Sequence, residues 1–119
     1  IEYLFPKAHA TAYVLMALRI AWFKLYYPAE FYAAYFSVYF ERNEFNFNVL
    51  AYGLDEIDSY LNKIKSIKGE DSCEYHNIYT AMIVAKECIA RGINFLPPDI
   101  EKSDPNNYIP ERDNIRIPL

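Results

Sequence analysis

The first quarter of the sequence lacks acidic side chains. From Tyr3 to Ala29, 27 consecutive residues contain no aspartate or glutamate, although the 119-residue chain carries a net charge of −4. The same stretch holds Lys7, Arg19 and Lys24. The excess of acidic residues lies in residues 41–119. The overall acidity therefore does not exclude an anionic partner for the first segment.

Cysteine and long apolar runs are also scarce. Cys73 and Cys88 fall in one predicted helix, where fifteen residues correspond to roughly 22 Å, beyond the reach of a disulfide. His9 and His76 belong to no full set of Cys and His residues at zinc-ligand spacing, so we expect no metal site. No apolar run is long enough to span a bilayer and no secretory leader pattern is visible, so we expect no membrane contact; an interfacial helix is a minor alternative.

Glycine occurs three times and separates helical patterns. Pro28 ends a first predicted helix over residues 8–27, because proline disfavours helical geometry in the preceding residue, and it suits the first turn of a second helix over residues 28–40. Apolar residues at alternating spacings of four and three predict a third helix over residues 48–68, bent at Gly53. A fourth is predicted to begin at a capping box of Asp71 and Glu74 and to end at Gly92.

The helical pattern stops after Gly92. Residues 93–119 are short and interrupted by proline, which predicts two extended segments or a loose hairpin turning at "DPNN", residues 104–107. The sequence therefore predicts a mainly α fold of four to five helices with a small C-terminal β-hairpin or extended segment. We divide residues 1–119, as a single unit, into an aromatic helical segment 1–45, a helical pair 46–92 and an extended segment 93–119.

The first predicted helix carries two narrow basic stripes. At 100° per residue, His9, Tyr13 and Lys24 fall on one stripe and Arg19 on another, with alanine, leucine and valine between them. We therefore expect a mostly buried helix rather than one with a single broad polar face. Its amino end combines Lys7, His9 and unsatisfied N–H groups, which suits a phosphate or another anion, and no nearby carboxylate competes for them.

A purely structural interpretation of these residues stays open at this point. Lys7 and Lys24 would then be solvated, Arg19 would pair with Glu30 or Glu41, and His9 would be a hydrogen-bonded core residue. Tyrosines at helical spacing are more often packing residues than platforms for bases. The residues alone favour this interpretation over anion binding.

One stretch resembles a known family. "YLFPKAHATAYVLMALRIAWFKLYYPAEFYAAYFS", residues 3–37, resembles the fingers-region motif of the bacterial replicative DNA polymerase III alpha subunit, in the version of the PolC-type enzymes of the C family. The related DnaE-type enzymes have serine after the lysine that corresponds to Lys7 and a neutral residue in place of Arg19. The likeness extends more loosely through "ECIARGINFLPPDIEKS", residues 87–103, and is weakest over residues 41–72.

The resemblance implies a fragment of a larger polymerase. Such an enzyme transfers nucleotides from dNTPs to a primer 3′-end, with Mg²⁺ held on aspartates of a palm that lies outside this chain. Residues 1–45 would be the fingers motif, and we expect the fragment alone to be inactive, with no catalytic residue and no metal ligand. The implied partners are the DNA primer-template, the incoming dNTP, the remainder of the polymerase chain and the replisome with its sliding clamp. The implied location is the cytoplasm, associated with the nucleoid.

The resemblance also selects site residues. Lys7 and His9 would contact the triphosphate, and Tyr13 would pack against the base or sugar. Arg19 and Lys24 are weaker candidates for contacts with DNA or phosphate. Because Lys24 lies ~22 Å along the helix from His9, it would touch the DNA backbone or an internal acid rather than the same nucleotide.

A different class of function remains as the alternative. The chain could be a free-standing helical interaction module that buries an aromatic face in a protein partner, since sixteen of its 21 aromatic residues lie in residues 1–52. The chain starts at Ile1 rather than at methionine and closes on an alternating "NIRIPL", from which we expect an excised fragment.

Overall fold

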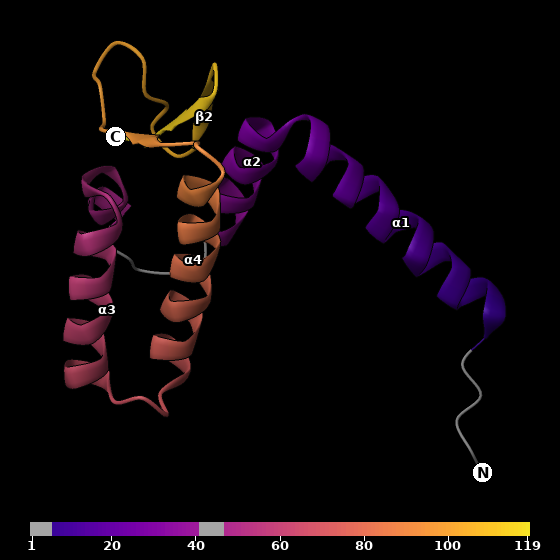
Figure 1. The fold of residues 1–119 in the computed structure, drawn as a ribbon, viewed down its shortest axis with the longest axis horizontal. Coiled ribbons are helices and arrows are strands. Elements are labelled where there is room, and N and C mark those ends of the chain that lie inside the picture. Colours follow the sequence, from indigo (N-terminus) through magenta and orange to yellow (C-terminus); the bar gives the residue numbers. More distant parts are fainter. Residues whose placement is uncertain (1–5, 41–46) are drawn as a thin grey trace.

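The computed structural model describes residues 6–40 and 47–119 (Figure 1). In chain order the elements are α1 (Lys7–Tyr26), α2 (Pro28–Phe40), the 3₁₀ helix η1 (Phe47–Tyr52), α3 (Leu54–Lys68), α4 (Cys73–Ala90), β1 (Phe95–Leu96), β2 (Ile109–Glu111) and β3 (Asn114–Arg116). The predicted fold class, mainly α with a small C-terminal β element, is confirmed. The first three residues of the quoted family motif, residues 3–5, lie outside the described residues.

Helix α1 projects from the rest of the molecule (Figure 1). None of its 20 residues is buried, and the molecule measures 53 × 37 × 25 Å as a result of this arm. The prediction of a mostly buried helix is therefore wrong for this chain. Pro28 ends α1 and begins α2, so the chain changes direction between the two helices.

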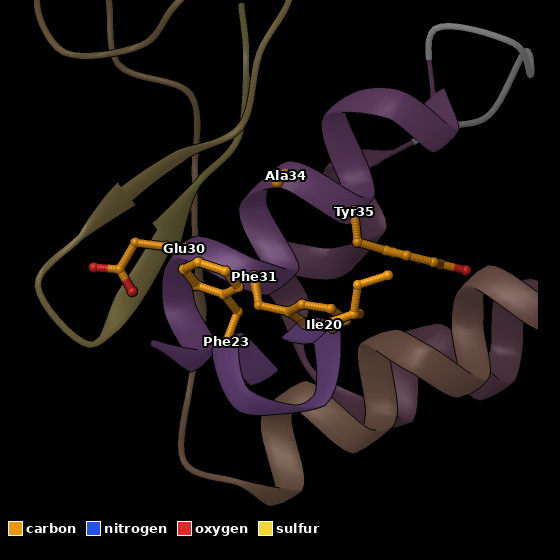
Figure 2. A pocket seen from close by; sticks show the side chains of 6 residues that line it. All are labelled: Ile20, Phe23, Glu30, Phe31, Ala34 and Tyr35. Carbon is orange, nitrogen blue, oxygen red and sulfur yellow. The ribbon is translucent and has the colours of Figure 1, made fainter. Parts of the chain in front are cut away.

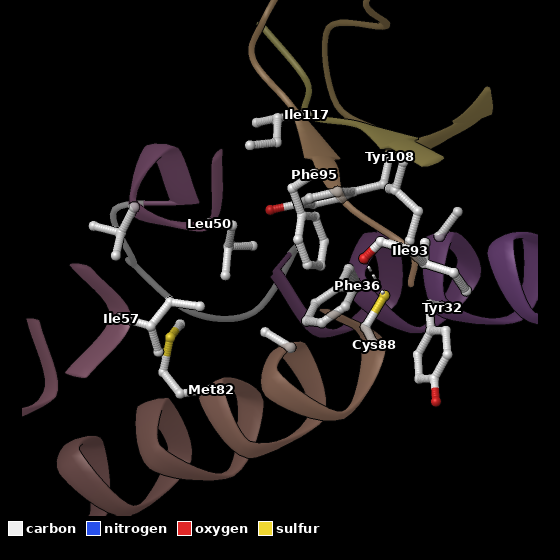
Figure 3. Packing of buried hydrophobic residues seen from close by; sticks show 14 of the residues in the cluster. Tyr32, Phe36, Leu50, Ile57, Met82, Cys88, Ile93, Phe95, Tyr108 and Ile117 are labelled. Carbon is white, nitrogen blue, oxygen red and sulfur yellow. Dashed lines mark hydrogen bonds between the residues drawn. The ribbon is translucent and has the colours of Figure 1, made fainter. Parts of the chain in front are cut away.

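The core lies between α2, η1, α3, α4 and the small sheet (Figure 3). Phe36 of α2 is fully buried, and its ring centroid lies 5.2 Å from that of Phe95 in β1 and 5.6 Å from that of Tyr108. Met82 of α4 and Ile57 of α3 fill the other end of the cluster. Each of the three predicted segments thus contributes to one core.

The third predicted helix is interrupted at its glycine. Residues 47–52 form η1, α3 starts at Leu54, and Gly53 lies between them with φ +93°. This backbone conformation is not helical, and residues with a Cβ rarely adopt it. The predicted helix is therefore broken at Gly53 rather than bent there. Ile57 and Leu61 of α3 are buried, as the amphipathic spacing predicted.

The caps of α4 differ by one residue from the prediction. Ser72 is the N-cap, and its Oγ accepts a hydrogen bond from the Tyr75 N–H at 3.1 Å. The predicted capping box of Asp71 and Glu74 is therefore wrong, because Asp71 lies one position before the cap. The predicted end is confirmed: Gly92 follows the last turn with φ +84°, the left-handed conformation that favours glycine.

The sheet has the strand order β1-β3-β2. Strand β3 pairs parallel with β1 and antiparallel with β2, so the hairpin turns at Arg112 and Asp113. The predicted turn at residues 104–107 is therefore wrong. There the Asp104 carboxylate accepts hydrogen bonds from the N–H groups of Asn106 and Asn107 at 2.9 and 2.8 Å, a local turn that precedes β2.

Candidate nucleotide-binding site on helix α1

The amino end of α1 combines several features that favour an anion. Lys7 is the first helical residue, and the preceding Pro6 provides no side-chain cap for the N–H groups of the first turn. No acidic residue lies in that turn. Unsatisfied N–H groups and the positive end of the helix dipole attract anions, and a lysine at this position adds a full charge.

His9 and Tyr13 lie together on one face of α1. Their ring centroids are 4.6 Å apart and their planes meet at 83°, an edge-to-face contact. Both side chains are exposed. The structure thus brings these two candidates together, as their spacing of one turn predicted, and the interpretation of His9 as a core residue is wrong.

Lys7 leaves α1 on a different side from His9. Residues two positions apart in a helix, such as these, are separated by about 200° around its axis. Lys7 instead shares a side with Thr11, whose Oγ1 donates a hydrogen bond to the Lys7 carbonyl oxygen at 2.8 Å. A ligand that touches both Lys7 and His9 would therefore lie over the end of the helix axis, where the first N–H groups point.

Lys24 belongs to a polar cluster at the other end of α1. Its Nζ lies 2.6 Å from Oε1 of Glu87 in α4, and 5.8 Å from the ring centroids of Phe31 and Tyr32 in α2. The sequence predicted DNA or an internal acid as the partner of Lys24, and Glu87 is such an acid. Lys24 is therefore neither purely solvated nor near the amino-terminal candidates.

We call Lys24, Tyr32, Glu87 and Arg91 the junction cluster, because they join α1, α2 and α4. The Tyr32 hydroxyl donates a hydrogen bond to Glu87 Oε1 at 2.7 Å. Arg91 Nη1 donates to the Tyr32 hydroxyl oxygen at 3.2 Å and to the Lys24 carbonyl oxygen at 2.9 Å. One carboxylate and one guanidinium thus bridge three helices.

The junction cluster changes the acidity of its members. Hydrogen bonds from Lys24 and then Tyr32 lower the pKa of the Glu87 carboxyl, so this group stays ionised at neutral pH. Burial raises the pKa of Tyr32 to about 12, although its hydrogen bond from Arg91 acts in the opposite direction. Sequence reasoning missed the cluster. The spacing of Glu87 and Arg91 by one helical turn was its visible signal.

Arg19 lies apart from both groups. It is exposed in the middle of α1, roughly 15 Å along the axis from His9. Within the described residues it forms no ion pair, so the alternative pairing with Glu30 is not made, and Glu41 lies outside those residues. The five candidates therefore form an amino-terminal group, an isolated arginine and a lysine in the junction cluster.

A groove of about 400 Å³ lies between α1 and α2 (Figure 2). It is lined by Ile20, Phe23, Glu30, Phe31, Ala34 and Tyr35. The lining is almost entirely apolar and contains no basic side chain, so the groove does not suit a triphosphate. Sequence reasoning missed it, because it depends on the angle between the two helices.

The described residues offer no metal site. Among residues 6–40 and 47–119, no group of three or more histidine, cysteine, aspartate or glutamate side chains is arranged to hold an ion. Burial raises the pKa of Cys88 to about 12 and keeps its thiol protonated, whereas Cys73 is exposed.

A search of residues 6–40 and 47–119 finds no helix with the length and apolar character needed to cross a bilayer.

Comparison with known proteins finds relatives that match the chain over its whole length. No protein-family model matches it. The DNA polymerase III PolC-type of Thermotoga maritima is 45% identical over 119 residues, all of this chain, and that of Latilactobacillus sakei is 43% identical over 114 residues, 96% of this chain. That of Clostridium perfringens is 37% identical over 119 residues. The chain spans about 8% of the length of each of these relatives. The resemblance identified in the sequence is thereby confirmed: over its whole length the chain is homologous to one segment of the PolC-type DNA polymerase III proteins.

Proposed function

We propose that the chain is part of the fingers of a bacterial replicative DNA polymerase and helps to bind the incoming dNTP and DNA during template-directed synthesis. The observation that carries this proposal is the match of the whole chain to one segment of the PolC-type proteins. The complete enzyme would be a DNA-directed nucleotidyltransferase of the cytoplasm and nucleoid. Its Mg²⁺ ligands and its contact with the sliding clamp would lie outside this chain, which alone would not polymerise.

The amino end of α1 is the proposed dNTP contact. A triphosphate needs positive charge both to bind and to stabilise the leaving pyrophosphate. The Lys7 ammonium, the first N–H groups of α1 and the His9 imidazole would provide charge-assisted hydrogen bonds to its oxygens. Tyr13, in edge contact with His9, would pack against the base or sugar.

Arg19 and Lys24 are proposed as weaker contacts with DNA phosphates. Arg19 is the better of the two, because it is exposed and forms no ion pair within the described residues. The ammonium of Lys24 already binds Glu87, so a phosphate would have to share it. Phosphate contacts of this kind position a duplex without reading its sequence.

The test is the substitution Lys7→Ala in a full-length polymerase that contains this segment. We expect the KM for dNTP to rise or kcat to fall by ~10-fold or more, because a charge-assisted phosphate contact is lost. Steady-state primer extension measures both constants. Lys63→Ala is the matched control, since Lys63 is an exposed lysine of α3, a helix that lies on the opposite side of the body from α1 (Figure 1). Unchanged kinetics in Lys7→Ala, or an equal loss in Lys63→Ala, would exclude this role for Lys7.

The exposure of α1 supports a second candidate function. A helix with apolar side chains around its whole circumference suits an interaction module that buries this surface in a protein partner. The salt dependence of binding distinguishes the two candidate functions. Binding of dNTP or DNA should weaken steeply as salt rises, whereas self-association through the aromatic surface should not. Sedimentation of the chain at low and high salt, with and without DNA, measures both.

A further inference from the structure

We propose that Glu87 is a positioning residue for helix α1. By binding Lys24 and Tyr32 at the same time, its carboxylate fixes the angle at which α1 leaves the body of the molecule. That angle determines where Lys7 and His9 lie. The inference rests on the proposed function only for its kinetic consequence; the orientation of α1 can be measured independently.

Helix α1 acts as a long arm attached at one end. The contacts described above between α1 and the body involve Ile20, Phe23 and Lys24, in its last two turns (Figure 1). Lys7 lies seventeen residues before Lys24, about 25 Å along the axis. A rotation of about 10° at the junction would therefore move Lys7 by about 4 Å. Displacements far smaller than this are enough to impair a catalytic contact.

Glu87 is the shared acceptor of the junction cluster. Its Oε1 receives both the Lys24 ammonium at 2.6 Å and the Tyr32 hydroxyl at 2.7 Å. Arg91 closes the arrangement from the other side, where it binds the Tyr32 hydroxyl oxygen and the carbonyl oxygen at the last turn of α1. Removal of the Glu87 charge would therefore disconnect an α1 side chain from α2 and α4 together.

The side-chain contacts across the apolar groove are poorly suited to fix an angle. Ile20 and Phe23 face Phe31 and Tyr35 across the apolar groove (Figure 2). Apolar contact is non-directional, so these side chains restrain the angle of α1 only weakly. Hydrogen bonds lose strength when their angle changes, so the junction cluster adds a directional restraint on α1 to that of the backbone hydrogen bonds of Tyr27, which links α1 to α2.

The experiment compares Glu87→Gln with Asp58→Asn in the full-length polymerase. Gln keeps the shape of Glu87 but removes its charge. Asp58 forms an ion pair with Lys86, the neighbour of Glu87 on α4, and that pair joins α3 and α4 without touching α1. Spin labels attached through non-natural amino acids at Thr11 and Lys63 report the distance between α1 and α3. Primer extension with the unlabelled enzymes reports KM and kcat for dNTP.

We expect Glu87→Gln to broaden or shift the distance distribution. The KM for dNTP should rise about 3- to 10-fold, and kcat should change less than about 2-fold. The reason is that the substitution removes one charged hydrogen-bonded contact that positions a binding group. Asp58→Asn should change neither. Tyr32→Phe, which keeps the buried ring, should give a smaller effect in the same direction. Lys24→Glu combined with Glu87→Lys should recover part of the loss caused by Lys24→Glu alone.

The outcomes separate the two proposals. An unchanged distance distribution in Glu87→Gln, or the same change in Asp58→Asn, would overturn the positioning role. A changed distribution with an unchanged KM would support the positioning role of Glu87 and overturn the proposed role of the α1 amino end in dNTP binding.

Discussion

Helices α1 and α4 have similar lengths and are both rich in apolar residues, but their surroundings are opposite. None of the 20 residues of α1 is buried, whereas six of the 18 residues of α4 are: Tyr75, Ile78, Ala81, Met82, Ala85 and Cys88. The buried positions of α4 recur at spacings of three and four, so they form one face. The apolar residues of α1 surround its axis. Burial in this chain follows from the arrangement of apolar residues and from the path of the chain, and composition alone does not determine it.

The two methionines of the chain give the largest expected contrast between these helices. Met82 of α4 is fully buried, and Met16 of α1 is 54% exposed. Met82→Ala should lower the free energy of unfolding by ~2–5 kcal/mol, because it leaves a cavity in the core. Met16→Ala should change it by less than ~0.5 kcal/mol. Urea unfolding of the chain, followed by circular dichroism, measures both.

A large loss in Met16→Ala would contradict this contrast. It would mean that α1 is covered in solution, and the concentration dependence of the transition would then show whether a second copy of the chain covers it. Equal, small effects of both substitutions would instead contradict the description of the core around Met82.

A pair of alanines tests the same contrast by overpacking. Ala85 of α4 is fully buried, so Ala85→Trp should destabilise the chain by ~1–3 kcal/mol or more. Ala17 of α1 is exposed, and Ala17→Trp should be tolerated within ~0.5 kcal/mol. The mostly buried helix expected from the sequence would make Ala17→Trp strongly destabilising as well, and the exposure of α1 reverses that expectation. Thermal unfolding compares the variants, and a melt of Ala17→Trp as low as that of Ala85→Trp would restore the original prediction.

The smallest expected effect concerns the junction where the two helices meet. The pKa of Glu87 is lowered in the folded state, so its ionised form stabilises the junction fully above about pH 4.3, the value of a free glutamate, and this contribution is lost as the pH falls below it. The loss should stay below ~1 kcal/mol, because the Glu87 side chain is 42% exposed. Trp22, the single tryptophan, lies two residues from Lys24 and reports the change by fluorescence. Glu87→Gln should abolish this pH dependence; if it persists, another group is responsible.

The sequence predicted the local features of the fold well. Pro28 and Gly92 ended their helices as expected, because proline and a left-handed glycine act on the neighbouring residues alone. The hairpin was predicted at the wrong place because Asp104 forms a local turn that resembles a hairpin signal. The burial of α1 could not be predicted, since burial depends on which elements pack against the helix.

In the candidate site too, the local features were predictable from the sequence and the contacts between elements were not. The contact between His9 and Tyr13 follows from their spacing of four residues, and so does the position of Lys7 on another side of α1. The junction cluster was not predictable, because Lys24 and Glu87 are far apart in the sequence and meet only when α1, α2 and α4 have packed. Helical spacing shows which residues share a face, but it does not identify partners on other elements.

The order of the strands has a consequence for the synthesis of the chain. Strand β3, the last of the three to be made, lies in the middle of the sheet, and Ile115 within it and Ile117 just after it are fully buried. Strands β1 and β2 have no pairing with each other and need β3 between them. While the ribosome still covers residues 114–119, the sheet therefore cannot pair and the core lacks Ile115 and Ile117, so this segment must emerge before the body can close.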